Sequence, residues 1–258
     1  MYNENTKSTI YLHRHLPGGK SQIVPCTMGF LSPSDAERSI ELQRRIAKGL
    51  SGDIYLPSED EDVIRYTKGD GITAGVWFED SLICARTVKT DRDWVNSALA
   101  AIEEPPDPTG KTAVTGYTIV DKEFRGNNVQ FLSYFLSENL LARDFDTIVT
   151  TVSPRNIFSL LNIMHCGFYI TGLRDLYGSY LRYILRKNLR EAAPIWTNWH
   201  HAMPIRDVKG QQRALAEGNV GYKVINKLRG FFVLYGHRGE EAPQDQRRFR
   251  PRPPIRLL

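Results

Sequence analysis

The sequence contains few of the features that mark secreted, membrane-spanning or disulfide-bonded proteins. Its 258 residues include only three cysteines, Cys26, Cys84 and Cys166, which are far apart and form no CxxC pair. This pattern argues against a disulfide framework and for a reducing compartment. No apolar run approaches the ~20 residues that a membrane-spanning helix needs. The N-terminus also lacks the basic-then-apolar order of a signal peptide. We therefore expect a cytoplasmic protein that is not bound to a membrane.

Metal-binding patterns and internal repeats are missing as well. The pairs His13/His15 and His200-His201 have no cysteine or carboxylate partner at a ligand spacing, so we expect no metal site. The apolar and charged fractions are ordinary, which predicts a folded core. The formal net charge is +5, which favours acidic partners such as cofactor phosphates or nucleic acid.

Two periodicities alternate along residues 9–188 and indicate a mixed α/β domain. Apolar and β-branched runs predict strands at residues 9–12, 22–26, 72–78, 82–88, 112–120, 147–152, 168–171 and 180–185. Capping residues predict helix starts at Ser32 and Ser58. Apolar residues at helical spacing predict further helices at residues 91–102, 127–145 and 153–166.

The composition changes after residue 188. We predict irregular structure over residues 191–204, a helix over 207–217, and a hairpin formed by residues 222–226 and 231–235. From residue 239 the chain is rich in Arg, Pro and Gln, which is typical of disorder. The sequence thus predicts an N-terminal segment (1–21), an α/β domain (22–188), a C-terminal extension (189–238) and a basic tail (239–258).

The most informative motif is Phe124-Arg125-Gly126-Asn127-Asn128-Val129-Gln130, which joins the strand at 112–120 to a helix. Free N–H groups at a helix N-terminus and the positive end of the helix dipole form an anion site. A second strand–helix unit follows and ends in Cys166-Gly167-Phe168. Such units form a parallel strand pair with a right-handed crossover. Together they suggest a cofactor with a diphosphate, and from that an acyl-CoA-dependent transferase.

Residues 22–188 resemble the GNAT superfamily of N-acetyltransferases. The matching features are the strand end Thr118-Ile119-Val120-Asp121, Arg125 at the first loop position, and the later helix with Asn156 and Ser159. The resemblance implies a mixed sheet whose fourth and fifth strands are parallel and splay apart, with acetyl-CoA in the gap. It implies that acetyl-CoA contacts Thr118, Ile119, Val120, Arg125, Gly126, Asn127, Asn128, Val129, Gln130, Asn156 and Ser159.

The chain departs from the family pattern at two places. Asn128 and Gln130 replace two loop glycines. Asn tolerates positive φ, so Asn128 can keep the turn, whereas Gln130 must turn its side chain away from the phosphates or donate a hydrogen bond to them. Ile163 replaces a tyrosine that protonates the departing thiolate in many family members. Tyr177 and Tyr169 are the substitute candidates, and we select Tyr177 as the catalytic residue.

The resemblance implies direct attack of a neutral primary amine on the thioester of acetyl-CoA. Oxyanion stabilisation would come from a backbone N–H near Val120. Base candidates are Glu79, Asp80 and Asp121, among which the sequence does not choose. We expect two additions to the family pattern, residues 91–111 and 188–235, to cover the acceptor slot. The acceptor and the acyl-chain preference stay open, as does a homodimer.

Two other function classes fit the sequence. Because Ile163 and the missing glycines depart from the pattern, the protein could be an acyl-CoA-binding regulator without turnover. A nucleic-acid-associated protein that uses Arg247-Arg248-Phe249-Arg250 is the third class.

Overall fold

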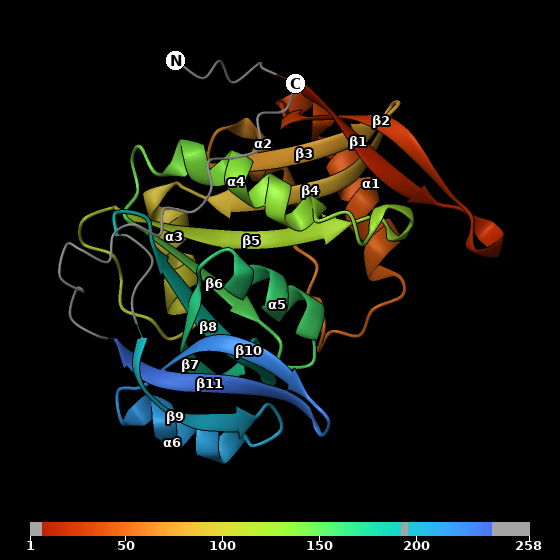
Figure 1. Cartoon of the computed structure of the whole chain (residues 1–258). Coiled ribbons are helices and arrows are strands. Elements are labelled where there is room, and N and C mark those ends of the chain that lie inside the picture. The colour runs from red at the N-terminus through yellow and green to blue at the C-terminus, as the bar shows by residue number, and fades with distance from the viewer. Residues whose placement is uncertain (1–6, 192–195, 239–258) are drawn as a thin grey trace, which may run out of the picture. The chain divides into compact units, whose positions relative to one another are not determined.

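The computed structural model describes residues 7–191 and 196–238 (Figure 1). The chain forms two compact units, residues 1–190 and residues 191–258. The basic tail at 239–258, the proposed nucleic-acid segment included, lies outside the described residues. Each unit is described separately below.

The first unit is a mixed sheet with helices on both faces, which confirms the predicted α/β class. Its strand order is β1-β2-β3-β4-β5-β6-β8-β7. The strands are β1 Ser8–His15, β2 Ser21–Phe30, β3 Gly71–Phe78, β4 Ser81–Lys89, β5 Thr112–Val120, β6 Thr147–Val152, β7 Tyr169–Leu176 and β8 Tyr180–Asn188. All neighbouring pairs with a described register are antiparallel except β5 and β6, which are parallel.

The helices of this unit begin near the predicted capping residues. Asp35 and Ser32 form a capping box over the short helix η2 (Pro33–Asp35), which leads into α1 (Ala36–Ala47). Helix α2 (Asp60–Lys68) starts after Glu59 rather than Ser58 and has no side-chain cap. Asp91 caps α3 (Arg92–Ala100) by accepting from Trp94 N at 2.9 Å. Helices α4 (Val129–Leu141) and α5 (Ile157–His165) are shorter than predicted at both ends.

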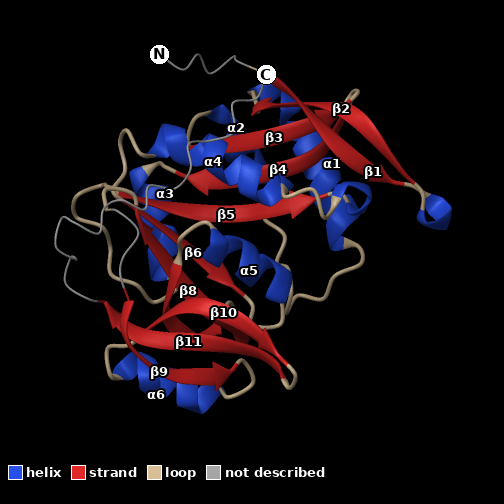
Figure 2. Cartoon of the chain, in the orientation of Figure 1, coloured by secondary structure: helices blue, strands red, loops and turns tan. Residues whose placement is uncertain are grey.

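Two apolar layers cover the two faces of the sheet. Alternate residues of a strand point to opposite faces, so Val76 packs beneath α4 with Cys84 and Val120, while its neighbour Trp77 packs beneath α1 and α2. Figure 2 shows α4 on one side of β3–β5 and α1 and α2 on the other. The near-continuous apolar strands β3 and β4 follow from this double burial.

The second unit combines β9 (Trp196–Pro204), α6 (Val208–Ala216), β10 (Val220–Lys227) and β11 (Gly230–Arg238), with strand order β10-β11-β9. The predicted helix and hairpin are confirmed. The prediction of irregular structure up to residue 204 is wrong, because residues from Trp196 form a strand along β11. Strand formation there depends on pairing with a segment about 30 residues later, which no local pattern reports.

Candidate functional site

Strands β5 and β6 are paired over only three residue pairs. They pair from Thr112 with Thr147 to Val114 with Val149, and no pairing follows. Strand β4 still holds β5 as far as Val120, and β8 holds β6 as far as Val152. The two strands therefore diverge beyond Val114, and their facing edges lack a partner strand. This is the splayed parallel pair that the resemblance to the GNAT superfamily implies.

A β-bulge shapes the diverging part of β5. The register between β4 and β5 shifts between Arg86 and Val88. The Thr87 hydroxyl accepts from Tyr117 N at 2.8 Å and donates to Tyr117 O at 3.3 Å, which fixes the bulge. A Cβ at Gly116 would lie 2.0 Å from the Tyr66 hydroxyl oxygen, so only glycine fits there. Bulges of this kind redirect side chains next to functional sites.

A cavity of about 500 Å³ opens along the splay. Its walls come from β4, β5, β6, α2, α4 and α5, from the α1–α2 loop (residues 48–59), and from the end of α3. Polar lining residues include Glu59, Asp62, Arg86, Lys89, Thr118, Gln130, Thr151, Asn156, Ser159, Asn162, Tyr177 and Arg182. Every lining residue falls between Ile54 and Arg182, in the first unit.

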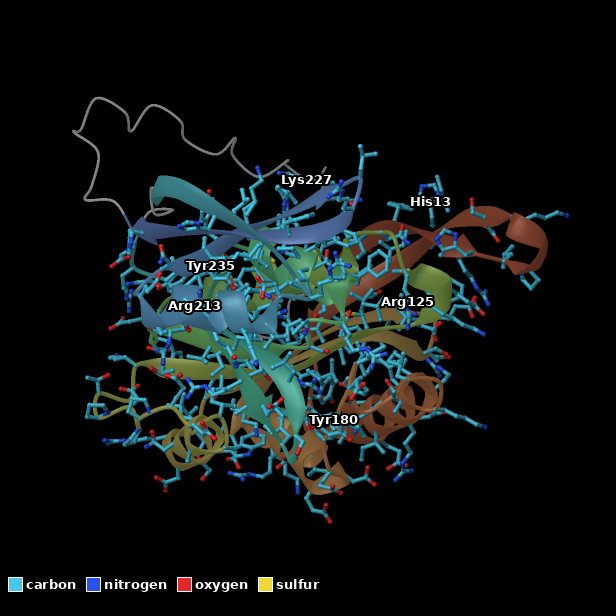
Figure 3. The ribbon with its side chains drawn as sticks, turned by 90° about the horizontal axis from the view of Figure 1, so that it is seen from below. His13, Arg125, Tyr180, Arg213, Lys227 and Tyr235 are labelled. Carbon is cyan, nitrogen blue, oxygen red and sulfur yellow. The ribbon has the colours of Figure 1, made fainter. Side chains whose placement is uncertain are left out.

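The loop before α4 (residues 121–128) is held by its own polar groups and by β1. Gly126 has φ +82° and Asn128 has φ +56°, so Asn128 adopts the left-handed conformation that the sequence suggests. Asn127 Oδ1 accepts from His13 N at 2.8 Å, and its Nδ2 donates to His13 O at 2.7 Å. Figure 3 shows His13 and Arg125 at the same side of the unit. The Asn127 side chain is thus occupied by β1, which leaves main-chain amides to meet an anion.

Gln130 turns toward α5 in place of the missing loop glycine. Its Oε1 accepts a hydrogen bond from Asn162 Nδ2, and both residues line the cavity. Asn156 caps α5 by accepting from Ser159 N at 3.2 Å. The first turns of α4 and α5 therefore both border the cavity.

The structure places the predicted site residues in three groups. Thr118, Gln130, Asn156, Ser159 and Tyr177 line the cavity. Ile119, Val120 and Val129 are buried in the apolar layers. Arg125, Gly126, Asn127 and Asn128 form the loop before α4 outside the cavity lining, and Arg125 Nε donates to Val120 O at 3.2 Å.

Tyr177 lies in the β7–β8 turn and faces the end of β6. Its hydroxyl lies 3.3 Å from Thr151 Oγ1, and its φ is +53°. Tyr177 is 42% exposed, and the partial burial of its hydroxyl raises the pKa of Tyr177 further above neutral pH, so the phenol is protonated there. Ile163 is buried in the same cavity. Tyr169 is not among the lining residues, so Tyr177 is the candidate that can offer a proton inside the cavity.

The predicted base candidates lie away from the cavity. Glu79 and Asp80 form the β3–β4 turn, and Asp121 accepts from Arg45 in a salt bridge at 2.9 Å. The carboxylates that line the cavity are Glu59 and Asp62, from the start of α2. The sequence analysis interpreted the segment that begins at Ser58 only as a helix start.

Arg86 is a further functional candidate that sequence reasoning missed. It stands inside an apolar strand, is only 1% exposed, and lines the cavity. A charged residue in the middle of a doubly buried strand was the signal that could have identified it.

The α1–α2 loop is fixed by buried side chains. Gln43, on α1, donates to Ser58 O at 2.7 Å, accepts from Ser58 N at 3.1 Å, and accepts from the Tyr55 hydroxyl at 2.9 Å. Arg182 donates to Gly52 O at 2.9 Å and to Asp53 O at 2.8 Å. This wall of the cavity is therefore preformed.

Part of the insert at residues 91–111 also lines the cavity, through Ala98, Ala101 and Ile102. Glu104, just beyond, accepts from Arg174 at 2.8 Å and from Arg186, which ties the insert to β7 and β8. The insert is thus an integrated wall of the first unit.

No cluster of three or more His, Cys, Asp or Glu side chains that could hold a metal ion occurs among residues 7–191 and 196–238. Within the same ranges, every helix is too short or too polar to cross a bilayer.

Neither a protein-family model nor a curated protein matches the sequence. Solved structures do match. The structure of smu.2055 from Streptococcus mutans is 16% identical and covers 63% of this chain and 99% of its own, with a TM-score of 0.50. An acetyltransferase of the GNAT family from Streptococcus pneumoniae is 14% identical and covers 63% of this chain and 98% of its own, again at 0.50. The structure of yncA from Salmonella typhimurium, described with its cofactor acetyl-CoA, is 11% identical and covers 67% of this chain and 99% of its own, with a TM-score of 0.50. The first unit of this chain therefore has the fold of the GNAT acetyltransferases.

Proposed function

We propose that this protein is an N-acetyltransferase that moves an acetyl group from acetyl-CoA to a primary amine. The observation that carries this proposal is the divergence of β5 and β6 beyond Val114, which opens unpaired strand edges onto the cavity. The description of yncA, a structural neighbour, with acetyl-CoA as its cofactor supports the same donor here.

The donor fits the cavity by its chemistry. Its pantetheine arm carries two amides, which can pair with the free edge of β5 as a short strand would. Its diphosphate would meet the main-chain amides of residues 126–130 at the N-terminus of α4. Asn127 and His13 hold that loop in place before the donor arrives.

The acceptor amine would enter between the α1–α2 loop and the end of α3. An alkylammonium has a pKa near ~10, so it must lose a proton before it attacks. Glu59 and Asp62 line this end of the cavity and are the candidate bases. Tyr177, protonated and beside Thr151, is the candidate acid for the departing thiolate.

Calorimetric titration of the full-length protein with acetyl-CoA tests donor binding, and thiol release over a panel of primary amines tests turnover. We expect saturable heat with one site and CoA release with at least one amine. A titration without heat would refute the proposal.

A second candidate is an acyl-CoA-binding regulator without turnover. Ile163 occupies the position at which many GNAT proteins have a tyrosine that protonates the departing thiolate. This reading predicts thermal stabilisation by acetyl-CoA with no CoA released over the whole amine panel. CoA release that disappears in Tyr177→Phe would favour the enzyme instead.

A further inference from the structure

Arg86 is a buried cation with incomplete pairing. One terminal nitrogen donates to Thr118 Oγ1 at 3.0 Å. The Nε and the other terminal nitrogen are enclosed and have no hydrogen-bond partner among the described residues. Arginine stays charged in proteins, and a buried donor without a partner lowers the stability of the fold. A group kept at this cost beside a cavity needs an explanation.

The surroundings of Arg86 compensate its positive charge only in part. Its guanidinium lies 4.7 Å from the Tyr134 ring centroid, which is a cation–π contact. Glu138, the carboxylate that acts on Arg86, is already paired with Lys187 at 2.7 Å. Burial raises the pKa of Cys84 to about 12 and that of Cys166 to about 11, so both thiols stay neutral. The positive charge of Arg86 therefore polarises the Thr118 hydroxyl, to which it donates a hydrogen bond.

The hydrogen bond from Arg86 fixes what the Thr118 hydroxyl can do. Arginine has no acceptor, so Thr118 Oγ1 must accept in this contact. Its own hydrogen then remains available to donate, and the described hydrogen bonds give it no acceptor in the protein. Thr118 lines the cavity and lies on the part of β5 that is not paired with β6. The hydroxyl is thus a donor, strengthened by a neighbouring charge, at the wall of the cavity.

We propose that Thr118 donates a hydrogen bond to the carbonyl oxygen of the bound acyl thioester, and that Arg86 is the positioning residue that orients and polarises this hydroxyl. The inference rests on the proposed function. During transfer the amine nitrogen forms a bond to the carbonyl carbon and the C–S bond breaks. The amine loses a proton and the thiolate gains one. Negative charge gathers on the carbonyl oxygen between these events, and the Thr118 hydroxyl with Arg86 behind it stabilises that charge.

The carbonyl stretch of the bound thioester reports this hydrogen bond without any acceptor. Acetyl-CoA labelled with ¹³C at the thioester carbonyl is bound to the full-length protein and its infrared band is compared with that of the CoA thioester in an aprotic solvent. We expect a shift to lower frequency in the wild type and in Thr118→Ser. Thr118→Val should lose the shift, and Arg86→Gln should reduce it while Arg86→Lys restores part of it.

A matched control is Thr73→Val, which makes the same change at a buried strand position outside the cavity lining. It should leave the band where the wild type has it. Once an acceptor is known, Thr118→Val should lower kcat roughly 10²-fold with little change in KM for the donor.

The outcomes separate this inference from the function it rests on. If calorimetry shows no donor binding, both fail. If the donor binds and the band is the same in the wild type and in Thr118→Val, only the role of Thr118 and Arg86 is refuted. Should Arg86→Gln not fold, the comparison of Thr118→Val with Thr118→Ser decides.

Discussion

The two ends of the cavity are held in place by different kinds of contact. At the proposed donor end, the α4 N-terminus and the loop at 121–128 offer main-chain amides, whose geometry is fixed by local turns and by the two hydrogen bonds between Asn127 and the His13 backbone. At the proposed acceptor end, the walls are side chains from the α1–α2 loop, α2, the end of α3 and β8, separated by up to about half of the chain. A common donor can be bound by backbone that many sequences can form, whereas acceptor recognition depends on this chain's own side chains.

The largest effect should come from the carboxylates at the acceptor end. If one is the base, Asp62→Asn or Glu59→Gln should lower kcat roughly 10²–10⁴-fold and leave the acetyl-CoA affinity unchanged. Glu79→Gln, in the turn away from the cavity, is the control and should have no effect on turnover. Steady-state kinetics with an amine from the panel and donor calorimetry measure both quantities. Equal activity of both cavity variants and the control would exclude these carboxylates as bases.

The next effect should come from Gln43, which holds the α1–α2 loop. Gln43→Ala removes three hydrogen bonds and leaves the partly buried backbone groups of Ser58 without the Gln43 side chain as partner. We expect a loss of about 1–3 kcal/mol in the free energy of unfolding. KM for the acceptor should rise while the donor Kd stays constant. If the donor Kd rose by the same factor as KM for the acceptor, the donor end and the acceptor end would not be structurally independent.

Asn128 offers the opposite test at the donor end. Its φ of +56° costs a β-branched residue roughly 1–2 kcal/mol, so Asn128→Val should weaken acetyl-CoA binding by about tenfold. Asn128→Gly keeps the left-handed turn and should bind the donor as the wild type does. Calorimetry with acetyl-CoA measures both variants, and unchanged affinity in Asn128→Val would show that this turn does not position the amides.

The smallest effect concerns the insert and depends on pH. Burial tends to raise the pKa of Asp107, but hydrogen bonds from Thr109 and Thr112 outweigh it and lower the pKa from 3.8 to about 2. The ionised form is therefore favoured in the fold, and its stabilisation is complete above pH ~4 and lost as the pH falls toward 2. Asp107→Asn should lower the free energy of unfolding by about 1 kcal/mol at pH 7. Chemical unfolding should show that the difference in this free energy between wild type and variant becomes smaller below pH 4. A difference that stays constant down to pH 3 would exclude ionisation of Asp107 as its cause.

Particular residues show where sequence reasoning succeeds. Asn128 was predicted to keep a positive-φ turn because Asn is the best substitute for Gly, and its backbone confirms this. The strand–helix–strand order around residues 112–166 predicted the parallel pair of β5 and β6, and the resemblance to the GNAT superfamily implied that this pair splays apart. These features depend on residues close together in the chain. The insert at residues 91–111 is part of the core of the first unit, because Leu99 and Ile102 belong to a buried cluster with Val114 and Val149.

Other residues show where sequence reasoning fails. Glu79, Asp80 and Asp121 were the base candidates, among which the sequence did not choose, yet the carboxylates that line the cavity are Glu59 and Asp62. The role of Arg86 depends on Thr118, 32 residues later, and on Tyr134 and Glu138 of a helix on one face of the sheet. Strand β9 forms because β11 pairs with it.

The sequence by itself determined the order of strands and helices in the first unit and the positive-φ turn before α4, since hydrophobic periodicity, capping residues and turn chemistry act over a few neighbouring residues. Only the tertiary structure decided which side chains line the cavity and which of them are left with unpaired charge. Burial and electrostatic compensation depend on groups that the fold brings together from distant parts of the chain, and a local pattern carries no record of them.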